Sequence, residues 1–275
     1  MTLSTTRNNP AKQKKVKTKK QKAIAATCAV AFWLLVWHVV SLCVGSELVL
    51  VSPVKVVQTL FTVIFDPDFL KTVWYSAARI LGGFFIALTL GTVLGWVASR
   101  FWVVETLLRP ITAVIKATPV ASFIILVLLW FSGKNLSVII SMLMVFPVIY
   151  MNVLEGIRSA DEKLLEMAQV FRLSVSKKLL YIYLPAVAPF FVSACSVSLG
   201  LCWKSGIAAE VIGTPDGSIG AVFYQAKIFL QTSELLAWTV VVVAVSVAFE
   251  KLFMFLLRLI LKKLKMEDVL NGKRA

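Results

Sequence analysis

Long apolar runs alternate with short charged segments along this chain. Six of these runs are nearly free of charge. A helix rises about 1.5 Å per residue and a bilayer's hydrocarbon core is about 30 Å thick, so each run is long enough to span it or nearly so. The runs cover residues 23–44, 80–98, 111–132, 136–154, 186–203 and 235–261. This pattern predicts an all-α polytopic membrane protein with about six transmembrane helices.

The composition supports a membrane protein. Of 275 residues, 59% are hydrophobic and 16% are charged, whereas soluble domains carry about 25% charged residues. Lys and Arg number 29 against 14 Asp and Glu, a net charge of +15. These bases cluster at the chain ends and between apolar runs, which is typical of membrane topology rather than of nucleic-acid binding. We therefore expect a lipid bilayer and no nucleic acid as partner.

The distribution of basic residues predicts the orientation. Placing both termini in the cytoplasm puts most Lys and Arg on the inner side, as the positive-inside rule requires. The segment 48–72 is apolar but broken by prolines and aspartates, so we expect an outer loop with an interfacial helix there. We divide the chain into a basic cytoplasmic tail (1–22), a first helix with its outer loop (23–76), a transmembrane core (77–261) and a second cytoplasmic tail (262–275).

One charged segment, 155–185, is longer than a simple connection between two helices needs. Four of its apolar residues recur at spacings of four, three and four, which predicts one helix face: Leu164, Ala168, Phe171 and Val175. A second helix over 177–183 should end before Pro185, since a residue preceding proline is disfavoured in the α region. We expect a two-helix cytoplasmic projection that docks a partner. A folded connector without a partner is the alternative.

The stretch "EMAQVFRLSVSKKLLYIYLP" (166–185) resembles the EAA loop of inner-membrane permease subunits of ABC importers. Arg172 stands where that family usually has Gly, and Met167 replaces its middle Ala. Gly permits a turn at this point that Arg allows only at a cost in free energy. The resemblance implies that this loop couples the permease to a separate cytoplasmic ATPase. It assigns the contact to Glu166, Met167, Ala168, Phe171, Arg172, Leu184 and Pro185.

The resemblance extends over most of the chain. The segments 71–95 and 126–161 are similar to the permease core of this family, and 198–213 resembles a signature of its nitrate, sulfonate, taurine and bicarbonate branch. The resemblance implies a non-enzymatic transport subunit in the bacterial cytoplasmic membrane. A solute-binding protein would deliver a small anion to it, and it would work together with a second copy of itself. ATP and Mg²⁺ would bind the ATPase. This chain has no phosphate loop, because "SGKN" at 132–135 lacks the required spacing.

Lys204 and Glu210 are candidates for the translocation pathway, because ionisable groups at membrane depth are costly and commonly functional. They should lie at the outer end of the fifth span and just beyond it. Their separation of six places them on different helix faces, so no ion pair is expected. Lys204 either meets an anionic substrate or extends to the outer headgroups. We expect no metal site, since the one histidine and four cysteines fit no metal-ligand spacing.

Three alternatives remain at this stage. An ion-gradient-driven secondary transporter would show inverted repeats and acids near the membrane centre, and neither is evident in the sequence. A membrane-embedded enzyme would need clustered His, Asp, Glu or Ser within the spans, and none is evident. Within the permease family, a thiamine-precursor-like heterocycle is an alternative substrate.

Overall fold

The structure, a computed structural model, describes residues 19–264, and every regular element in this range is helical. The all-α prediction is confirmed. The predicted tails lie outside the described residues up to residue 18 and from residue 265 on. The chain divides after Lys55 into two units, which are described separately here.

The first unit contains one long helix, α1 (Lys19–Val44). It confirms the first predicted span, and its 26 residues suffice to cross a bilayer. Large apolar side chains such as Trp33, Leu35 and Leu42 are exposed along it. A helix that exposes apolar side chains in this way is suited to contact with lipid.

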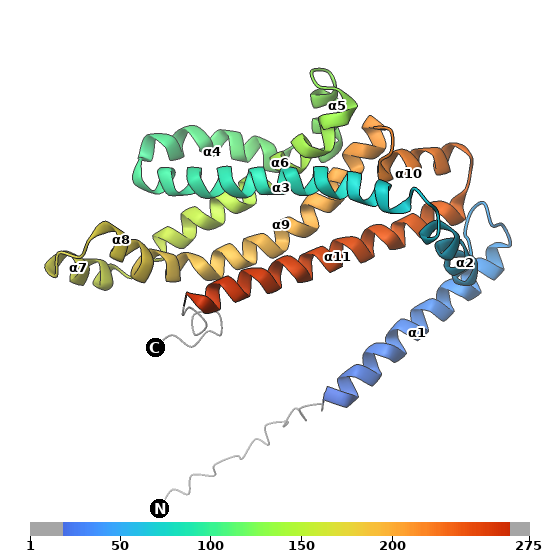
Figure 1. The fold of residues 1–275 in the computed structure, drawn as a ribbon, viewed down its shortest axis with the longest axis horizontal. Helices are drawn as coiled ribbons and strands as arrows, with labels where there is room; N and C mark the ends of the chain where they lie inside the picture. The colour runs from blue at the N-terminus through green and yellow to red at the C-terminus, as the bar shows by residue number, and fades with distance from the viewer. Residues whose placement is uncertain (1–18, 265–275) are drawn as a thin grey trace, which may run out of the picture. The chain divides into compact units, whose positions relative to one another are not determined.

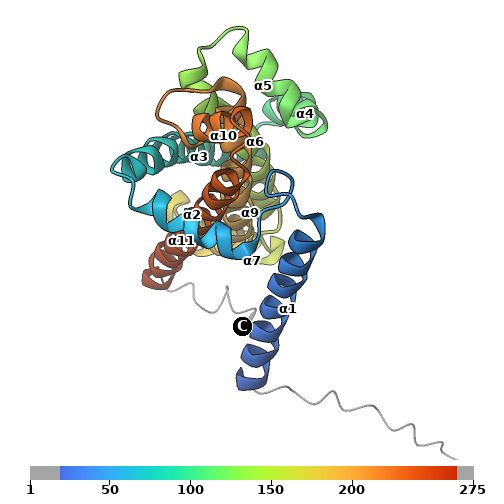
Figure 2. The same cartoon turned by 90° about the vertical axis from the view of Figure 1, so that its right-hand side faces the viewer.

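Three long helices form the core of the second unit: α3 (Phe69–Arg100), α6 (Gly133–Arg158) and α9 (Leu184–Gly213). The middle helix α6 packs against both of the others, as Figures 1 and 2 show. Phe84, Ile149 and Leu199, one from each helix, are almost completely buried in a single cluster. The predicted spans 80–98, 136–154 and 186–203 are thereby confirmed, and each helix extends beyond them.

Helices α3 and α6 approach closely along a row of small residues in α3. A Cβ atom added at Gly91 would lie 3.0 Å from the Cβ of Ile149, and one added at Gly95 would lie 3.0 Å from the Cβ of Val153. The absence of side chains at the two glycines therefore lets the backbones approach, as small-xxx-small pairs do in membrane helices.

The predicted single span over 111–132 is wrong. The structure has two helices there, α4 (Trp102–Ala117) and α5 (Val120–Leu128), bent by 106° relative to each other. The break falls at Thr118, which is extended and precedes Pro119; proline disfavours the α region for the residue before it. Figure 1 shows α5 turned away from the direction of α4. Five helices of the described residues are long and apolar enough to cross a membrane, and the number rises to six if the bent pair forms one span.

Helix α11 (Thr232–Lys263) lies at the periphery and confirms the last predicted span. It contacts the core through a few side chains, such as Phe253, whose ring lies edge-on to Phe84 at 5.3 Å between centroids. Another part of its apolar surface, including Val243, Leu252 and Phe255, is exposed. We assign this exposed face to the lipid.

Two short helices lie toward the outer side. The segment 48–72 contains the expected helix, α2 (Pro53–Ile64), and its 12 residues are too few to cross a bilayer. Its place at the membrane interface stays a prediction. Helix α10 (Ile219–Ile228) was not predicted. Its N-cap is Ser218, whose side chain accepts a hydrogen bond of 3.0 Å from the N–H of Ala221. The sequence before it is rich in turn-forming residues and did not indicate a helix.

Candidate functional site

The cytoplasmic loop between α6 and α9 is folded. Helix α7 (Glu162–Val170) is capped by Asp161, whose side chain accepts a hydrogen bond of 2.9 Å from the N–H of Lys163. A short helix, α8 (Val175–Lys178), follows. Figure 1 shows α7 and α8 at one end of the bundle, beyond the ends of α6 and α9. The sequence correctly predicted a compact helical projection at this point.

Arg172 terminates α7 in the left-handed conformation, with φ of 49°. Its N–H donates to the carbonyl of Gln169 at 3.0 Å, and the N–H of Leu173 donates to the carbonyl of Ala168 at 2.9 Å. These two bonds form a Schellman motif, in which the position held by Arg172 favours glycine. The predicted turn is present, and an arginine adopts a strained backbone to make it.

The base of the loop has a small apolar core of its own. Ala168 is completely buried and packs with Ala160 and Ile182, from the segments before and after the loop helices. Ala168 is therefore an internal packing residue, which fixes α7 against the start of the next helix. A larger side chain here would displace α7.

The tip of the loop exposes apolar side chains. Phe171 is 70% exposed and Val175 is 78% exposed, and Glu166 and Met167 are also exposed. The prediction that Leu164, Ala168, Phe171 and Val175 share one face is wrong. Because the chain reverses at Arg172, Val175 belongs to the next helix, and Ala168 faces the loop core while the others face outward.

The predicted end of the second helix before Pro185 is also wrong. Helix α8 continues through a π-helical turn, η1 (Leu179–Tyr183), directly into α9. The N–H of Leu184 donates to the carbonyl of Leu179 across this wider turn. Pro185 directly follows this turn as the second residue of α9, and because the helix is continuous there, its missing N–H leaves one carbonyl of the preceding turn without that donor. The helix therefore runs without interruption from the loop into the membrane.

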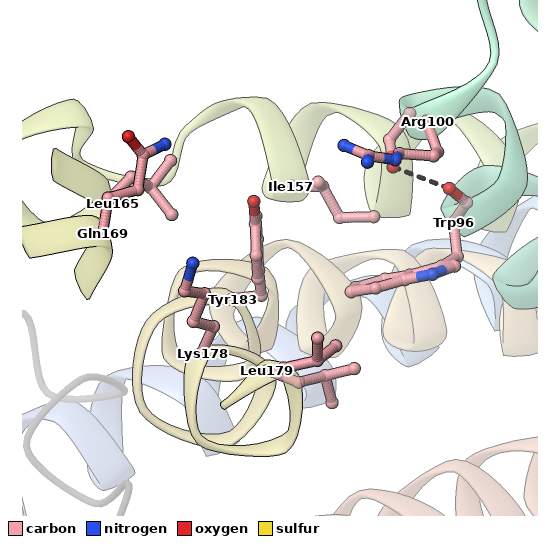
Figure 3. A pocket seen from close by; sticks show the side chains of 10 residues that line it. Trp96, Arg100, Ile157, Leu165, Gln169, Lys178, Leu179 and Tyr183 are labelled. Carbon is pink, nitrogen blue, oxygen red and sulfur yellow. Dashed lines mark hydrogen bonds between the residues drawn. The ribbon is translucent and has the colours of Figure 1, made fainter. Parts of the chain in front are cut away.

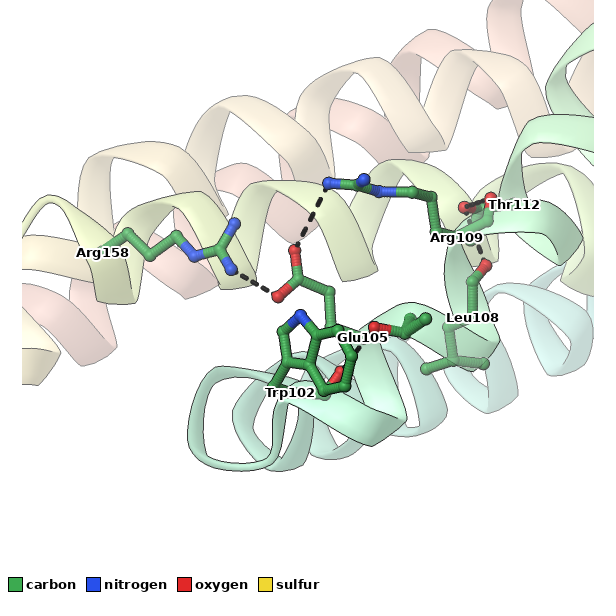
Figure 4. Close-up of polar contacts among 7 residues, drawn as sticks. Trp102, Glu105, Leu108, Arg109, Thr112 and Arg158 are labelled. Carbon is green, nitrogen blue, oxygen red and sulfur yellow. Dashed lines mark hydrogen bonds and ion pairs between the residues drawn. The ribbon is translucent and has the colours of Figure 1, made fainter.

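A cluster of charged residues connects α4 to the end of α6 (Figure 4). This cluster was not predicted from the sequence. Glu105 of α4 is only 14% exposed and accepts a hydrogen bond of 2.5 Å from Nη2 of Arg158. Arg109, one helical turn along α4, lies 4.0 Å from the other carboxylate oxygen and is 81% exposed. Arg158 is the last residue of α6, so its ion pair with Glu105 holds the start of the loop against α4. From the sequence, only the contact between Glu105 and Arg109 could be expected, because the two residues are four positions apart on one helix.

Glu210 lies inside α9, which continues to Gly213, and is completely buried. The expectation that it lies just beyond the span is corrected by this longer helix. Ser76 of α3 donates a hydrogen bond of 2.6 Å to Oε2 of Glu210, and the N–H of Gly220 donates to the same oxygen at 3.3 Å. In this structure the carboxylate joins α3, α9 and α10.

Lys204 has a different environment on the same helix. It is exposed, as is Val197 two turns before it, and a Cβ added at Gly200 would meet no atom within 4 Å. These three positions form one open stripe on α9. In agreement with their spacing, Lys204 and Glu210 lie on different faces and form no ion pair among the described residues.

The long packed spans, the broken helix and the folded cytoplasmic loop define a polytopic membrane transport component. Comparison of the sequence with known families bears this out, since residues 87–266 match the family of the binding-protein-dependent transport system inner membrane component. The chain belongs to this family. It is therefore a permease subunit of an ABC importer and a multi-pass protein of the cytoplasmic membrane, and such subunits work with an ATPase and a solute-binding protein.

Several relatives match most of the chain. The aliphatic sulfonates transport permease protein SsuC of Escherichia coli (strain K12) is 34% identical over 230 residues, covering 78% of this chain and 82% of the relative. SsuC of Bacillus subtilis (strain 168) is 29% identical, covering 83% of each chain. The taurine transport system permease protein TauC of Escherichia coli (strain K12) is 27% identical, covering 78% and 80%.

A solved structure supports the fold. A chain of an amino acid ABC transporter, crystallised with histidines, superposes with a TM-score of 0.51 at 16% sequence identity. The match covers 70% of this chain and 96% of that one. At this level of identity the likeness concerns the fold alone.

Proposed function

We propose that this permease subunit carries a small anion, of the sulfonate, taurine or nitrate class, in an ATP-driven importer. The names of its relatives support this substrate class, since they include permeases for aliphatic sulfonates, taurine and nitrate. They favour it over a heterocycle importer and over a gradient-driven transporter. ATP and Mg²⁺ are assigned to the partner ATPase, and this chain supplies the membrane pathway.

The observation that carries the coupling proposal is the exposed apolar tip on a rigid base. Phe171 and Val175 project from the loop, while Ala168 and the Schellman turn hold α7 in place. Exposed aromatic and aliphatic side chains at the end of a folded element are typical of a protein contact. We assign this tip, with Glu166 and Met167 at its rim, to a groove on the ATPase.

Co-purification with the ATPase tests the docking. Phe171→Ala removes the most exposed aromatic side chain of the tip, and we expect retention of the ATPase to fall at least tenfold, as for a central interface residue. Trp130→Ala is the matched control, because Trp130 is similarly exposed but follows α5, outside the loop. If both variants retain as much ATPase as the parent chain, the tip is not part of the interface.

The pathway is assigned to the open stripe of α9, facing a second copy of this chain. A lysine on a lipid-facing surface would be costly, so Lys204 is better placed against a water-filled path. Its charge would attract an anion there. By contrast, Glu210 is assigned a structural role because its carboxylate is buried and hydrogen-bonded.

A further inference from the structure

A cavity of about 480 Å³ lies under the base of the loop, between the end of α3, the end of α6 and the segments α7, α8 and η1 (Figure 3). Trp96 and Leu179 form part of its apolar wall. Its polar groups come from separate elements, since Arg100 belongs to α3, Gln169 to α7 and Lys178 to α8. The cavity borders the exposed tip, because Val175 lines it, whereas Phe171 does not.

The cavity carries an uncompensated positive charge. Two cationic residues, Arg100 and Lys178, line it, and no acidic residue does. Within the described part of the chain, neither side chain forms an ion pair or a hydrogen bond. Arg158 and Arg109 differ, because both lie beside Glu105. Arg100 is exposed and Lys178 is half-buried, so solvent screens their mutual repulsion, and a bound anion would interact favourably with both.

The side chains are arranged to converge. In Figure 3 the charged ends of Arg100 and Lys178 point into the cavity, with the hydroxyl of Tyr183 between them in this view. The ring of Tyr183 packs edge-on against Trp96, at 5.6 Å between centroids and 79° between planes. Tyr183 and Gln169 each add a neutral donor. A guanidinium, an ammonium and such donors suit a tetrahedral oxyanion.

We propose that this cavity binds a phosphate group, with the headgroup of an anionic phospholipid as its source. The cavity is at the cytoplasmic end of the spans, where Trp and Tyr line the membrane interface and basic residues attract anionic headgroups. Leu179 and Leu180 are exposed beside it and offer an apolar surface for acyl chains. Inorganic phosphate shares the chemistry and is the other source to be tested. The proposal depends on the orientation of the chain and not on the ATPase contact.

A bound phosphate would connect two elements that otherwise share no polar contact. Arg100 ends α3 in the membrane core, whereas Lys178 ends α8 in the loop. Joining them through one anion would hold the loop against the bundle. The site would therefore make the position of the coupling loop depend on the lipid composition of the inner leaflet.

Native mass spectrometry of the full chain with defined lipids tests the proposal. Phosphatidylglycerol is the probe, and phosphatidylcholine of the same chain length is the neutral comparison. For Arg100→Gln/Lys178→Gln we expect phosphatidylglycerol to bind at least tenfold more weakly, since each basic residue near a headgroup contributes about 1 kcal/mol. Lys163→Gln/Lys177→Gln removes the same charge from exposed loop positions outside the cavity, and we expect less than a twofold effect.

Two further arms separate the outcomes. Arg100→Lys retains the charge and should retain binding, which distinguishes a lost site from a damaged fold. If inorganic phosphate binds with the same dependence on Arg100 and Lys178 while phosphatidylglycerol does not, the phosphate site stands and its source is the free anion. The proposal is overturned if neither probe binds, or if the cavity variant and the control variant lose equal affinity.

Discussion

Ser76 and Glu210 are 134 positions apart in the sequence, yet the hydroxyl of Ser76 donates a hydrogen bond of 2.6 Å to the Glu210 carboxylate. The same hydroxyl accepts a hydrogen bond of 2.9 Å from the N–H of Ile219, at the start of α10. Both side chains are completely buried. This contact joins α3, α9 and α10 at the outer side of the bundle and supplies partners for one carboxylate oxygen of Glu210, Oε2.

Removing the hydroxyl should destabilise the bundle. Ser76→Ala leaves the Glu210 carboxylate without its shortest donor and the Ile219 N–H without an acceptor, so we expect a loss of about 1–3 kcal/mol in the free energy of unfolding. Thermal unfolding of the purified protein in detergent measures it. Ser198→Ala is the matched control, because that hydroxyl is buried without a hydrogen-bond partner in the described part of the chain. Equal losses from both variants would contradict the role given to Ser76.

The close approach of α3 and α6 should not tolerate a side chain at Gly95. Gly95→Leu forces atoms against Val153, and we expect an overpacking cost of about 1–3 kcal/mol. Gly82→Leu in the same helix is the control, because a Cβ there meets nothing within 4 Å. Leu has a higher helix propensity than Gly, so propensity alone should stabilise both variants. Unfolding of the two in parallel should therefore show a loss for Gly95→Leu alone, and a comparable loss in the control would contradict the packing explanation.

Replacing Arg172 by Gly should stabilise the loop. Glycine adopts the left-handed conformation without the Cβ clash that arginine suffers, so we expect a gain of about 1 kcal/mol. Hydrogen exchange at the Leu173 amide, which is bonded to the Ala168 carbonyl, should slow about fivefold. Glu166→Gly, inside α7, should accelerate the same exchange. Faster exchange in Arg172→Gly would show that the arginine side chain stabilises the turn.

The ion pair between Glu105 and Arg158 at the loop entrance should have a larger coupling energy than the neighbouring pair between Glu105 and Arg109. Arg158 is 49% exposed, so solvent weakens its pairing with Glu105, and we expect a coupling energy of about 0.5–1 kcal/mol. Glu105 and Arg109 lie 4.0 Å apart with Arg109 81% exposed, and we expect about 0.3 kcal/mol. Two double-mutant cycles with Gln measure both. A larger coupling to Arg109 than to Arg158 would reverse this assignment.

Lys204→Gln should lower uptake of an anionic substrate while leaving the complex intact. Its charge on the open stripe of α9 is expected to contribute through attraction of the anion, and we expect at least a fivefold fall in uptake. Lys134→Gln, at an exposed position in the first turn of α6, is the control. Unchanged uptake with Lys204→Gln would favour a lysine that only reaches the headgroups.

The sequence predicted those features that depend on local pattern and length. Apolar runs located the long helices, because burial in lipid requires an unbroken apolar helix of membrane length. The sequence analysis treated 111–132 as one span despite Pro119, since a proline can kink a helix or break it and the surrounding packing decides which. The turn at Arg172 was expected from the resemblance of the loop, although arginine itself gives no signal for it.

The contacts between distant residues were not predictable in this way. Nothing in the sequence near Glu210 points to Ser76, because the partner depends on the rotation of α3 about its axis. Similarly, Glu105 and Arg158 belong to helices whose pairing appears only in the folded bundle. The continuous helix through Pro185 depends on a π-helical turn, for which the sequence carries no clear signal.

Uptake into proteoliposomes tests the central claim most directly. The chain is reconstituted with its ATPase and solute-binding protein, and uptake of labelled taurine, an alkanesulfonate and nitrate is followed. We predict that uptake of one of these anions requires ATP, the ATPase and the solute-binding protein. The uptake should not depend on an imposed ion gradient. Uptake driven by an ion gradient in the absence of the ATPase would contradict the account.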